Sequence, residues 1–157
     1  MVTLATERAL FDDVRIGECK VYYCRIPVTD HCAPSNLALT EFGELAASSD
    51  AGSAWVHFHC HGGDGRTTTF LALYDMVCRK QQSKDPFPPL ELFARRKYRL
   101  PPRYCLNPDG CDGLDRDGCH SGIPPAAAIA GWKRPLAIKR WAALNEFHEE
   151  LCRSRGS

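Results

Sequence analysis

The sequence predicts an α/β fold in which helices flank a sheet. Two short segments are rich in β-branched and aromatic residues, as strands are, and three longer segments place apolar residues at helical spacing. The chain has 157 residues, of which 44% are hydrophobic, and this is enough apolar material for one core. We therefore expect residues 1–157 to form a single domain with a sandwich architecture.

Strand and helix alternate in the first part of the predicted fold. Residues 18–29 are typical of a strand, and the turn-forming residues that follow end it. Residues 54–59 form a short apolar run between turn residues, which favours a buried strand. Between these strands, residues 36–47 are predicted to be a helix with apolar positions at Leu37, Leu39, Phe42, Leu45 and Ala46.

Helices dominate the second part. A helix is predicted over residues 66–80, with Phe70, Leu73, Tyr74 and Val77 on one face. A short basic helix is expected over residues 91–100, where two prolines end it, and residues 101–131 show no apolar periodicity and are predicted to form a long irregular loop. A final helix over residues 135–152 is predicted to bury Leu136, Ile138, Trp141, Leu144, Phe147 and Leu151.

Charge and cysteine content exclude several classes of protein. A net charge of +1 gives no general attraction to nucleic acid or membranes, so neither is expected as a partner. No segment is long and apolar enough to span a bilayer, and the chain as given has no signal peptide. Nine cysteines at irregular spacing favour a reducing compartment over a disulfide framework. We expect a cytoplasmic protein, or one that is delivered as an effector.

A glycine-rich turn after the second predicted strand carries the pattern C-x5-R-T. Cys60 begins the pattern, Arg66 and Thr67 end it, and the positions between are His61, Gly62, Gly63, Asp64 and Gly65. Glycines tolerate unusual φ angles, so this loop can curl its backbone N–H groups around a phosphate. The order of strand, glycine loop and helix also aims a helix N-terminus at the anion. The plainer interpretation is a strand-to-helix turn that happens to contain a cysteine.

The residue types in this pattern suit particular tasks in phosphoryl transfer. Backbone N–H groups and the helix N-terminus lower the pKa of the Cys60 thiol, which makes it a nucleophile. Arg66 offers a planar fork that matches two phosphate oxygens. Thr67 can donate its hydroxyl to the sulfur and help it leave. Asp30, in a proline-containing loop after the first predicted strand, is a candidate proton donor, although a turn aspartate fits that position equally well.

Two stretches resemble the bacterial protein-tyrosine-phosphatase-like phytases, which are also called cysteine phytases or inositol polyphosphate phosphatases. They are RIPVTDHCAP (25–34) and WVHFHCHGGDGRTTTFLALYDM (55–76), and the tail GWKRPLAIKRWAALNEF is similar to the last catalytic-domain helix of that family. The resemblance implies a three-layer sandwich with a central, mostly parallel sheet flanked by helices. It also implies an N-terminally shortened form, because only 29 residues precede Asp30.

The resemblance assigns roles to the candidate residues. Asp30 is then the general acid and later the base, His31 lies beside the substrate, Cys60 is the nucleophile and Arg66 clamps the phosphate. The implied substrate is an inositol polyphosphate such as phytate, no cofactor is needed, and an acid-shifted pH optimum follows because Asp30 must begin protonated while Cys60 is ionised.

Four basic residues near the C-terminus form a predicted cationic patch suited to a polyanion: Lys133, Arg134, Lys139 and Arg140. The resemblance implies that Lys133 and Arg140 contact peripheral phosphates of the inositol ring. An ordinary solvated helix face explains the same pattern.

The sequence departs from the family at three places and leaves other functions open. Asp64 puts an acid in the phosphate loop, and Arg96-Lys97 and Pro101-Pro102 stand where relatives carry R-Q and G-G, so the glutamine that positions water is not evident. A protein tyrosine phosphatase acting on a phosphoprotein, and a phosphate-binding module without activity, remain alternatives. A metal site is a third, from His57, His59, Cys60 and His61 or from Cys105, Cys111, Cys119 and His120.

Overall fold

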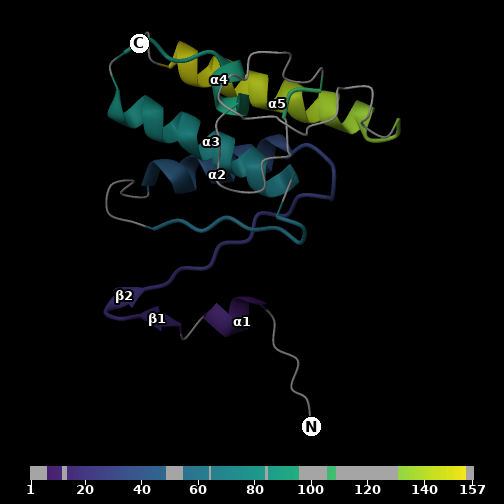
Figure 1. Cartoon of the computed structure of the whole chain (residues 1–157). Coiled ribbons are helices and arrows are strands. Elements are labelled where there is room, and N and C mark those ends of the chain that lie inside the picture. The colour runs from purple at the N-terminus through teal and green to yellow at the C-terminus, as the bar shows by residue number, and fades with distance from the viewer. Residues whose placement is uncertain are drawn as a thin grey trace.

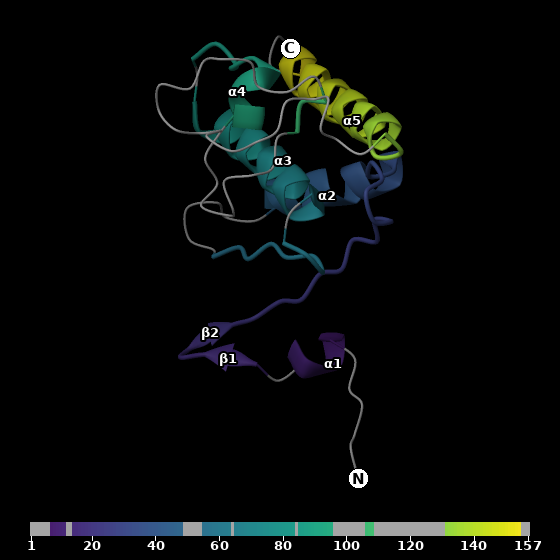
Figure 2. The same cartoon turned by 45° about the vertical axis from the view of Figure 1, so that its right-hand side comes forward.

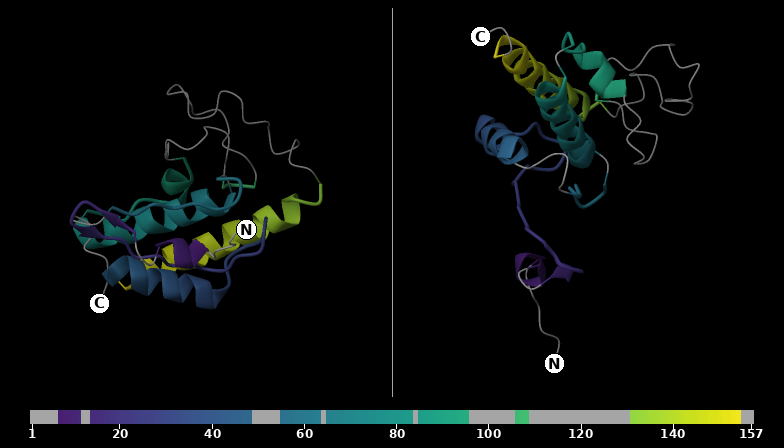
Figure 3. Two further views of the ribbon diagram at one scale, coloured as in Figure 1. Left: turned by 90° about the horizontal axis from the view of Figure 1, so that it is seen from below. Right: turned by 90° about the vertical axis from the view of Figure 1, so that its left-hand side faces the viewer.

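A computed structural model of the chain describes residues 7–11, 14–48, 55–63, 65–83, 85–95, 106–108 and 131–154. Four helices form its main body (Figure 1): α2 (Asn36–Ser48), α3 (Gly65–Gln82), α4 (Leu90–Arg95) and α5 (Arg134–Arg153). Helix α3 packs against each of the other three, and the long axes of α2, α3 and α5 run side by side when the body is seen from below (Figure 3, left). The site described below lies at the N-terminal end of α3.

The core is built around α3. Ala72, Leu73 and Met76 of this helix are completely buried. Phe42 from α2 and Leu144 from α5 cover them from two sides, with 2% and 1% of their surface exposed. Burying side chains of this size contributes about 1.5–3 kcal/mol each, which is why α3 is held in one position. The other buried hydrophobic residues of this cluster are Leu39, Ala46, Phe70, Val77, Leu90, Phe93, Leu106 and Phe147.

Three predicted helices are confirmed to within two residues at each end. The observed bounds are 36–48, 65–82 and 134–153. Local signals account for this agreement: Ser35 Oγ accepts a hydrogen bond from Ala38 N at 3.2 Å at the start of α2, and Pro135 occupies the first turn of α5. The burial predicted for Ile138 is wrong, because this residue is 48% exposed, and Leu37 in the first turn of α2 is 68% exposed.

The N-terminal elements lie away from the helical body (Figures 1 and 2). Helix α1 (Glu7–Phe11) precedes a small hairpin of β1 (Arg15–Ile16) and β2 (Cys19–Lys20), which pair antiparallel around a turn at Gly17. Gly17 has a φ of 62°, a value that glycine adopts without strain. Phe11 stacks on Tyr23 with ring centroids 5.4 Å apart, so α1 is fixed to the chain that leaves the hairpin.

The prediction of an α/β sandwich with a central, mostly parallel sheet is wrong for the described residues. Their one sheet is the two-residue pair of β1 and β2. In the predicted strands 18–29 and 54–59, only Cys19–Lys20 is a strand, while the described residues 21–29 and 55–59 belong to no sheet. A strand exists only when another segment pairs with it, and strand-like composition cannot supply that partner.

The remaining predicted elements fall partly outside the described residues. Helix α4 begins at Leu90 and is described to Arg95, so the prediction for residues 96–100 lies outside them. Most of the predicted loop 101–131 lies outside them as well. Leu106, one of its described residues, is 3% exposed and belongs to the hydrophobic core.

Candidate active site

An extended segment carries Cys60 to the start of α3. Side chains alternate along residues 55–59, so that Phe58 turns inward while His57 and His59 are exposed. The ring of Phe58 packs against Phe42 and Tyr74, with centroid distances of 6.1 and 5.4 Å. This contact anchors in the core the segment that leads to Cys60 and on to the N-terminus of α3.

The turn from Cys60 to α3 directs backbone amides at the sulfur. Gly63 adopts a φ of 76°, which closes the turn and which a residue with a side chain adopts only under strain. Burial alone would raise the pKa of the Cys60 thiol. Hydrogen bonds from the Thr67 hydroxyl and from the backbone of Thr67, Gly63 and Gly62 outweigh that effect and hold the pKa below its usual value.

Thr67 faces the sulfur from the first turn of α3. Thr67 is 2% exposed, and its Oγ1 makes no hydrogen bond of good geometry within the described part of the chain, although the hydroxyl is close enough to the Cys60 sulfur to lower the pKa of that thiol. Thr69, on the same helix, differs because its hydroxyl donates to the Gly65 carbonyl at 2.8 Å. The Thr67 hydroxyl therefore affects the Cys60 sulfur, whereas the Thr69 hydroxyl bonds to the backbone of its own helix. Asp64 lies outside the described residues.

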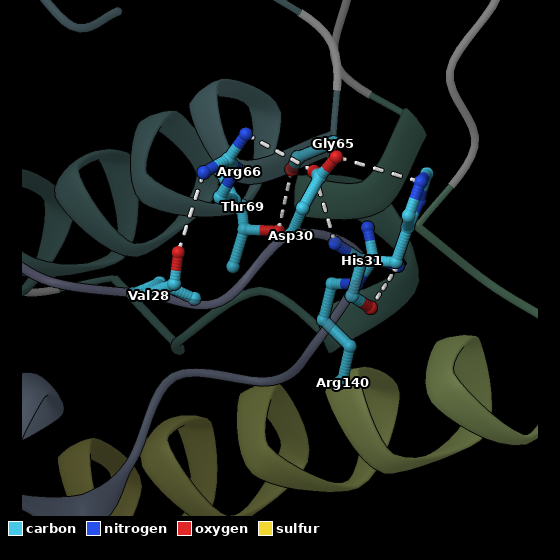
Figure 4. Close-up of polar contacts among 7 residues, drawn as sticks. All are labelled: Val28, Asp30, His31, Gly65, Arg66, Thr69 and Arg140. Carbon is cyan, nitrogen blue, oxygen red and sulfur yellow. Dashed lines mark hydrogen bonds and ion pairs between the residues drawn. The ribbon is translucent and has the colours of Figure 1, made fainter. Parts of the chain in front are cut away.

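Residues 29–32, the acid loop, meet the Cys60 segment through Arg66 (Figure 4). Arg66 Nη2 lies 3.0 Å from Asp30 Oδ1, and Arg66 Nη1 donates to the Val28 carbonyl at 3.3 Å. The guanidinium thus joins two segments that are 36 residues or more apart in sequence. Arg66 Nε is buried and has no hydrogen-bond partner in the described region.

The Asp30 carboxylate also shapes its own loop. Oδ1 accepts a hydrogen bond from His31 N at 3.0 Å, and His31 Nε2 lies 3.6 Å from Oδ2. The side chain of Asp30 is 66% exposed, so a bound molecule can reach it. Asp30 is therefore both a turn residue, as one interpretation of the sequence expected, and a neighbour of Arg66, as the other required.

His31 holds an unusual backbone conformation. Its φ is 62°, in the left-handed region. This conformation costs a residue with a side chain about 1–3 kcal/mol and persists only where contacts with the surrounding structure offset that cost. Arg140 Nη2 donates to the His31 carbonyl at 3.2 Å from the neighbouring helix α5. The ring of Trp132 meets the His31 ring edge-on, with centroids 5.1 Å apart.

The predicted cationic patch is divided between surface and interior. Arg134 and Lys139 are exposed, Lys133 is half-buried with its Nζ 5.1 Å from the Trp132 ring centroid, and Arg140 is only 4% exposed. The burial of Arg140 could have been found in the sequence, because it lies on the same helical face as Leu144 and Phe147.

Two other contributors to the site were not predicted. They are Trp132, which touches His31, and the carbonyl of Val28, which accepts a hydrogen bond from Arg66. No local pattern identifies a backbone carbonyl as a partner of a side chain 38 residues away.

Metal ligands and membrane spans were also sought in the structure. Among the described residues no three His, Cys, Asp or Glu side chains are arranged to hold a metal ion. His57 and His59 do lie together, with their rings stacked and centroids 5.7 Å apart, whereas Cys105, Cys111, Cys119 and His120 fall outside the described residues. None of the described helices has the length and apolar character needed to cross a bilayer.

Known proteins match this chain over different lengths. Residues 1–78, about half of the chain, match the family model of the PTP-like phytases. The description of that model reads "inositol hexakisphosphate". Paladin from Xenopus tropicalis is 36% identical over 75 residues, which are 45% of this chain and 8% of that protein. Paladin from Mus musculus is 42% identical over 59 residues, or 36% of this chain and 7% of that protein.

A third relative matches more of the chain at lower identity. Effector protein hopD2 from Pseudomonas syringae pv. tomato is 25% identical over 134 residues, which are 85% of this chain and 24% of that protein. The chain thus spans a quarter or less of the length of each of these relatives. No solved structure matches the chain significantly. The family match contains the acid loop, the C-x5-R-T turn and most of α3, and through these residues the chain belongs to the protein-tyrosine-phosphatase-like phytase family.

Proposed function

We propose that this chain hydrolyses phosphomonoesters through a phosphocysteine on Cys60, and that its substrates are inositol polyphosphates. The observation that carries the proposal is the set of hydrogen bonds around the Cys60 sulfur. Three backbone N–H groups and a hydroxyl, all from residues 62–67, converge on this atom and lower the pKa of its thiol. A structural cysteine has no need of such an arrangement, whereas a thiolate nucleophile depends on it.

The first half of the reaction uses Cys60 and Asp30. The Cys60 thiolate attacks phosphorus, the ester P–O bond breaks, and the leaving oxygen takes a proton from the Asp30 carboxyl. Arg66 stabilises the charge that spreads over the phosphoryl oxygens during this transfer. Its buried and unpartnered Nε, together with an Nη group, gives the two parallel donors that such a clamp needs.

The second half returns the protein to its starting state. Water attacks the phosphorus of the phosphocysteine and gives a proton to Asp30, and the P–S bond breaks to release the Cys60 thiolate and inorganic phosphate. The Thr67 hydroxyl donates to the sulfur and so stabilises the leaving thiolate. Cys60 and Asp30 are then in the protonation states in which they began.

Arg66 and Asp30 form an ion pair in the site before substrate binds. An incoming phosphoryl group competes with the Asp30 carboxylate for Arg66, since both offer oxygens to the same fork. Substrate binding therefore releases Asp30 from its cation and leaves it available to protonate the leaving group. The pair is partly exposed, so breaking it costs about 1 kcal/mol or less.

The family match and the charges beside the acid loop favour an inositol polyphosphate. Lys133 lies next to Trp132, which touches His31, so one cation borders the loop on the α5 side. Arg134 adds exposed positive charge at the start of the same helix. A ring with several phosphates gains from such neighbours, whereas a single phosphotyrosine does not.

The test measures phosphate release from phytate and from a phosphotyrosine peptide by the wild-type protein and by Cys60→Ser. We expect release from phytate, faster than from the peptide, and its loss in Cys60→Ser. Cys78→Ser is the matched control, because burial raises the pKa of Cys78, and its activity should be unchanged. Phosphate release by Cys60→Ser at the wild-type rate would refute the cysteine mechanism. Faster release from the peptide than from phytate by the wild type would favour a protein tyrosine phosphatase. No release from either substrate by the wild type would favour a phosphate-binding module.

A further inference from the structure

We infer that Arg140 is a positioning residue that holds the acid loop in the geometry required for proton transfer. This inference rests on the proposed function, because it takes Asp30 as the general acid. It differs from the role implied by the sequence, in which Arg140 contacts a peripheral phosphate of the substrate. The distinction is between binding the substrate and orienting the residue that protonates it.

Burial separates Arg140 from the other cations of α5. Its side chain is 4% exposed, whereas its neighbour Lys139 is exposed on the same helix. An arginine that binds a highly charged phosphate needs an open path to it, and little of the Arg140 surface is open. Burying a guanidinium is costly, so a buried arginine in a small protein has a specific partner.

The structure identifies one such partner in the acid loop. Arg140 Nη2 donates to the His31 carbonyl at 3.2 Å, across 109 residues of sequence (Figure 4). Hydrogen bonds from a charged donor are stronger than neutral ones, especially where water is excluded. This hydrogen bond fixes the orientation of the peptide group between His31 and Cys32, and through it α5 holds the acid loop.

The loop needs this support because its backbone is strained. His31 is the one residue other than glycine with a positive φ in the described part of the chain. Within the loop, Cys32 N donates to the Thr29 carbonyl at 3.1 Å and His31 N donates to Asp30 Oδ1 at 3.0 Å. These short-range bonds shape the turn, and the contacts of Arg140 and Trp132 with His31 fix it against α5.

The position of Asp30 depends on this arrangement. On one side the Asp30 carboxylate meets Arg66 at 3.0 Å, and on the other it caps the amide of His31, whose carbonyl Arg140 holds. When the phosphate of the substrate replaces Asp30 as the partner of Arg66, the ion pair no longer holds the Asp30 carboxyl in place. The hydrogen bond from Arg140 to the His31 carbonyl then keeps the carboxyl near the leaving oxygen. Arg140 therefore acts on proton transfer through the backbone and not through the substrate.

The experiment compares two leaving groups in four proteins. Phenyl phosphate has a poor leaving group that requires protonation, and 2,4-dinitrophenyl phosphate has a good one that does not. The proteins are the wild type, Asp30→Asn as the reference for a lost acid, Arg140→Met, and Lys139→Met as a matched control on the same helix. The value of kcat/KM is measured because it reports the step in which the ester bond breaks.

We expect Arg140→Met to lower kcat/KM for phenyl phosphate about tenfold to a hundredfold and for dinitrophenyl phosphate less than about threefold. Asp30→Asn should show the same selectivity, and Lys139→Met should show neither loss. Arg140→Lys, which keeps a charged donor, should recover part of the rate with the poor leaving group. Equal losses on both substrates in Arg140→Met would overturn the inference and favour direct contact with the phosphate.

A second measurement does not depend on activity. Amide hydrogen exchange of His31 and Cys32 should be faster in Arg140→Met and in Arg140→Lys than in the wild type, in proteins whose circular dichroism shows intact helices, and unchanged in Lys139→Met. Unchanged exchange in both Arg140 variants would overturn the inference. A wild type that hydrolyses neither phytate nor either aryl phosphate, together with faster exchange in the variants, would refute the proposed function and leave the contact between Arg140 and the loop established.

Discussion

The two halves of the site are built in different ways. The turn from Cys60 to Thr67 is local, since the donors that surround the sulfur come from residues 62, 63 and 67 of one continuous segment. The acid loop is held from a distance, by Arg66 on α3 and by Trp132 and Arg140 at and near the start of α5. One half thus follows from a short stretch of sequence, and the other exists only when the helices are packed.

This difference suggests how the two halves respond to change. A local turn keeps its geometry as long as its own residues are intact, and so the chemistry of Cys60 is expected to be robust. A loop held by remote contacts weakens whenever one of its supports is lost, even when Asp30 itself is unchanged. In the proposed mechanism, proton donation is therefore the step that substitutions elsewhere in the chain can tune.

The largest effect is expected at Arg66, because it belongs to both halves. Arg66→Lys keeps the positive charge but loses the planar fork, and we expect kcat/KM for phytate to fall about a hundredfold to a thousandfold. Phosphate-release kinetics measure this loss. Arg79→Lys is the control, since Arg79 lies on the same helix in an ion pair with Asp75 at 3.7 Å. An Arg66→Lys protein as active as the control would refute the clamp.

The next effect separates the two halves. Asp30→Asn removes the acid without changing the donors around the Cys60 sulfur, and kcat/KM for a substrate with a poor leaving group should fall about a hundredfold. Alkylation of Cys60 by iodoacetamide should keep its wild-type rate and pH dependence in the same protein. If alkylation slows as well, the two halves are coupled and the division described above is wrong.

How much of this could be read from the sequence depends on the range of each interaction. Helices α2, α3 and α5 were predicted because apolar spacing and end signals are local. The predicted strands 18–29 and 54–59 were largely wrong because a strand is defined by its partner. The same rule holds in the site, where the spacing of residues 60–67 predicts a local turn, but the contact of Arg140 with His31 needed α5 to be in place.

A smaller effect concerns the pKa of Cys60. Thr67→Val removes the hydroxyl that faces the sulfur, so the pKa of the thiol should rise and the midpoint of its pH-dependent alkylation should move to higher pH. Thr69→Val removes a hydroxyl bonded to the Gly65 carbonyl and should leave that midpoint in place. An unchanged midpoint in Thr67→Val would show that the backbone amides alone lower the pKa.

The lowered pKa of Cys60 also affects stability in a defined direction. Because the folded pKa lies below that of the unfolded thiol, ionisation of Cys60 stabilises the fold at pH values above the unfolded pKa. This contribution is lost as the pH falls through the folded pKa. Urea unfolding as a function of pH should show this dependence in the wild type and not in Cys60→Ser.

The smallest effect is expected on α2, the helix that follows the acid loop. Leu37 is 68% exposed, so Leu37→Ala should change the free energy of unfolding by less than about 0.5 kcal/mol. Phe42, five positions later, is 2% exposed, and Phe42→Ala should cost about 3–5 kcal/mol. Urea unfolding measures both, and equal losses would contradict the packing of α2 on α3.

The most direct test of a phosphocysteine mechanism is to find the intermediate. The wild-type protein is mixed with phytate, denatured rapidly at neutral pH, digested and analysed by mass spectrometry. We expect one phosphoryl group on the peptide that contains Cys60, attached to its sulfur, and none in Cys60→Ser. A phosphoryl group on His59 or His61, or an unmodified Cys60 in a protein that is turning over phytate, would contradict the account.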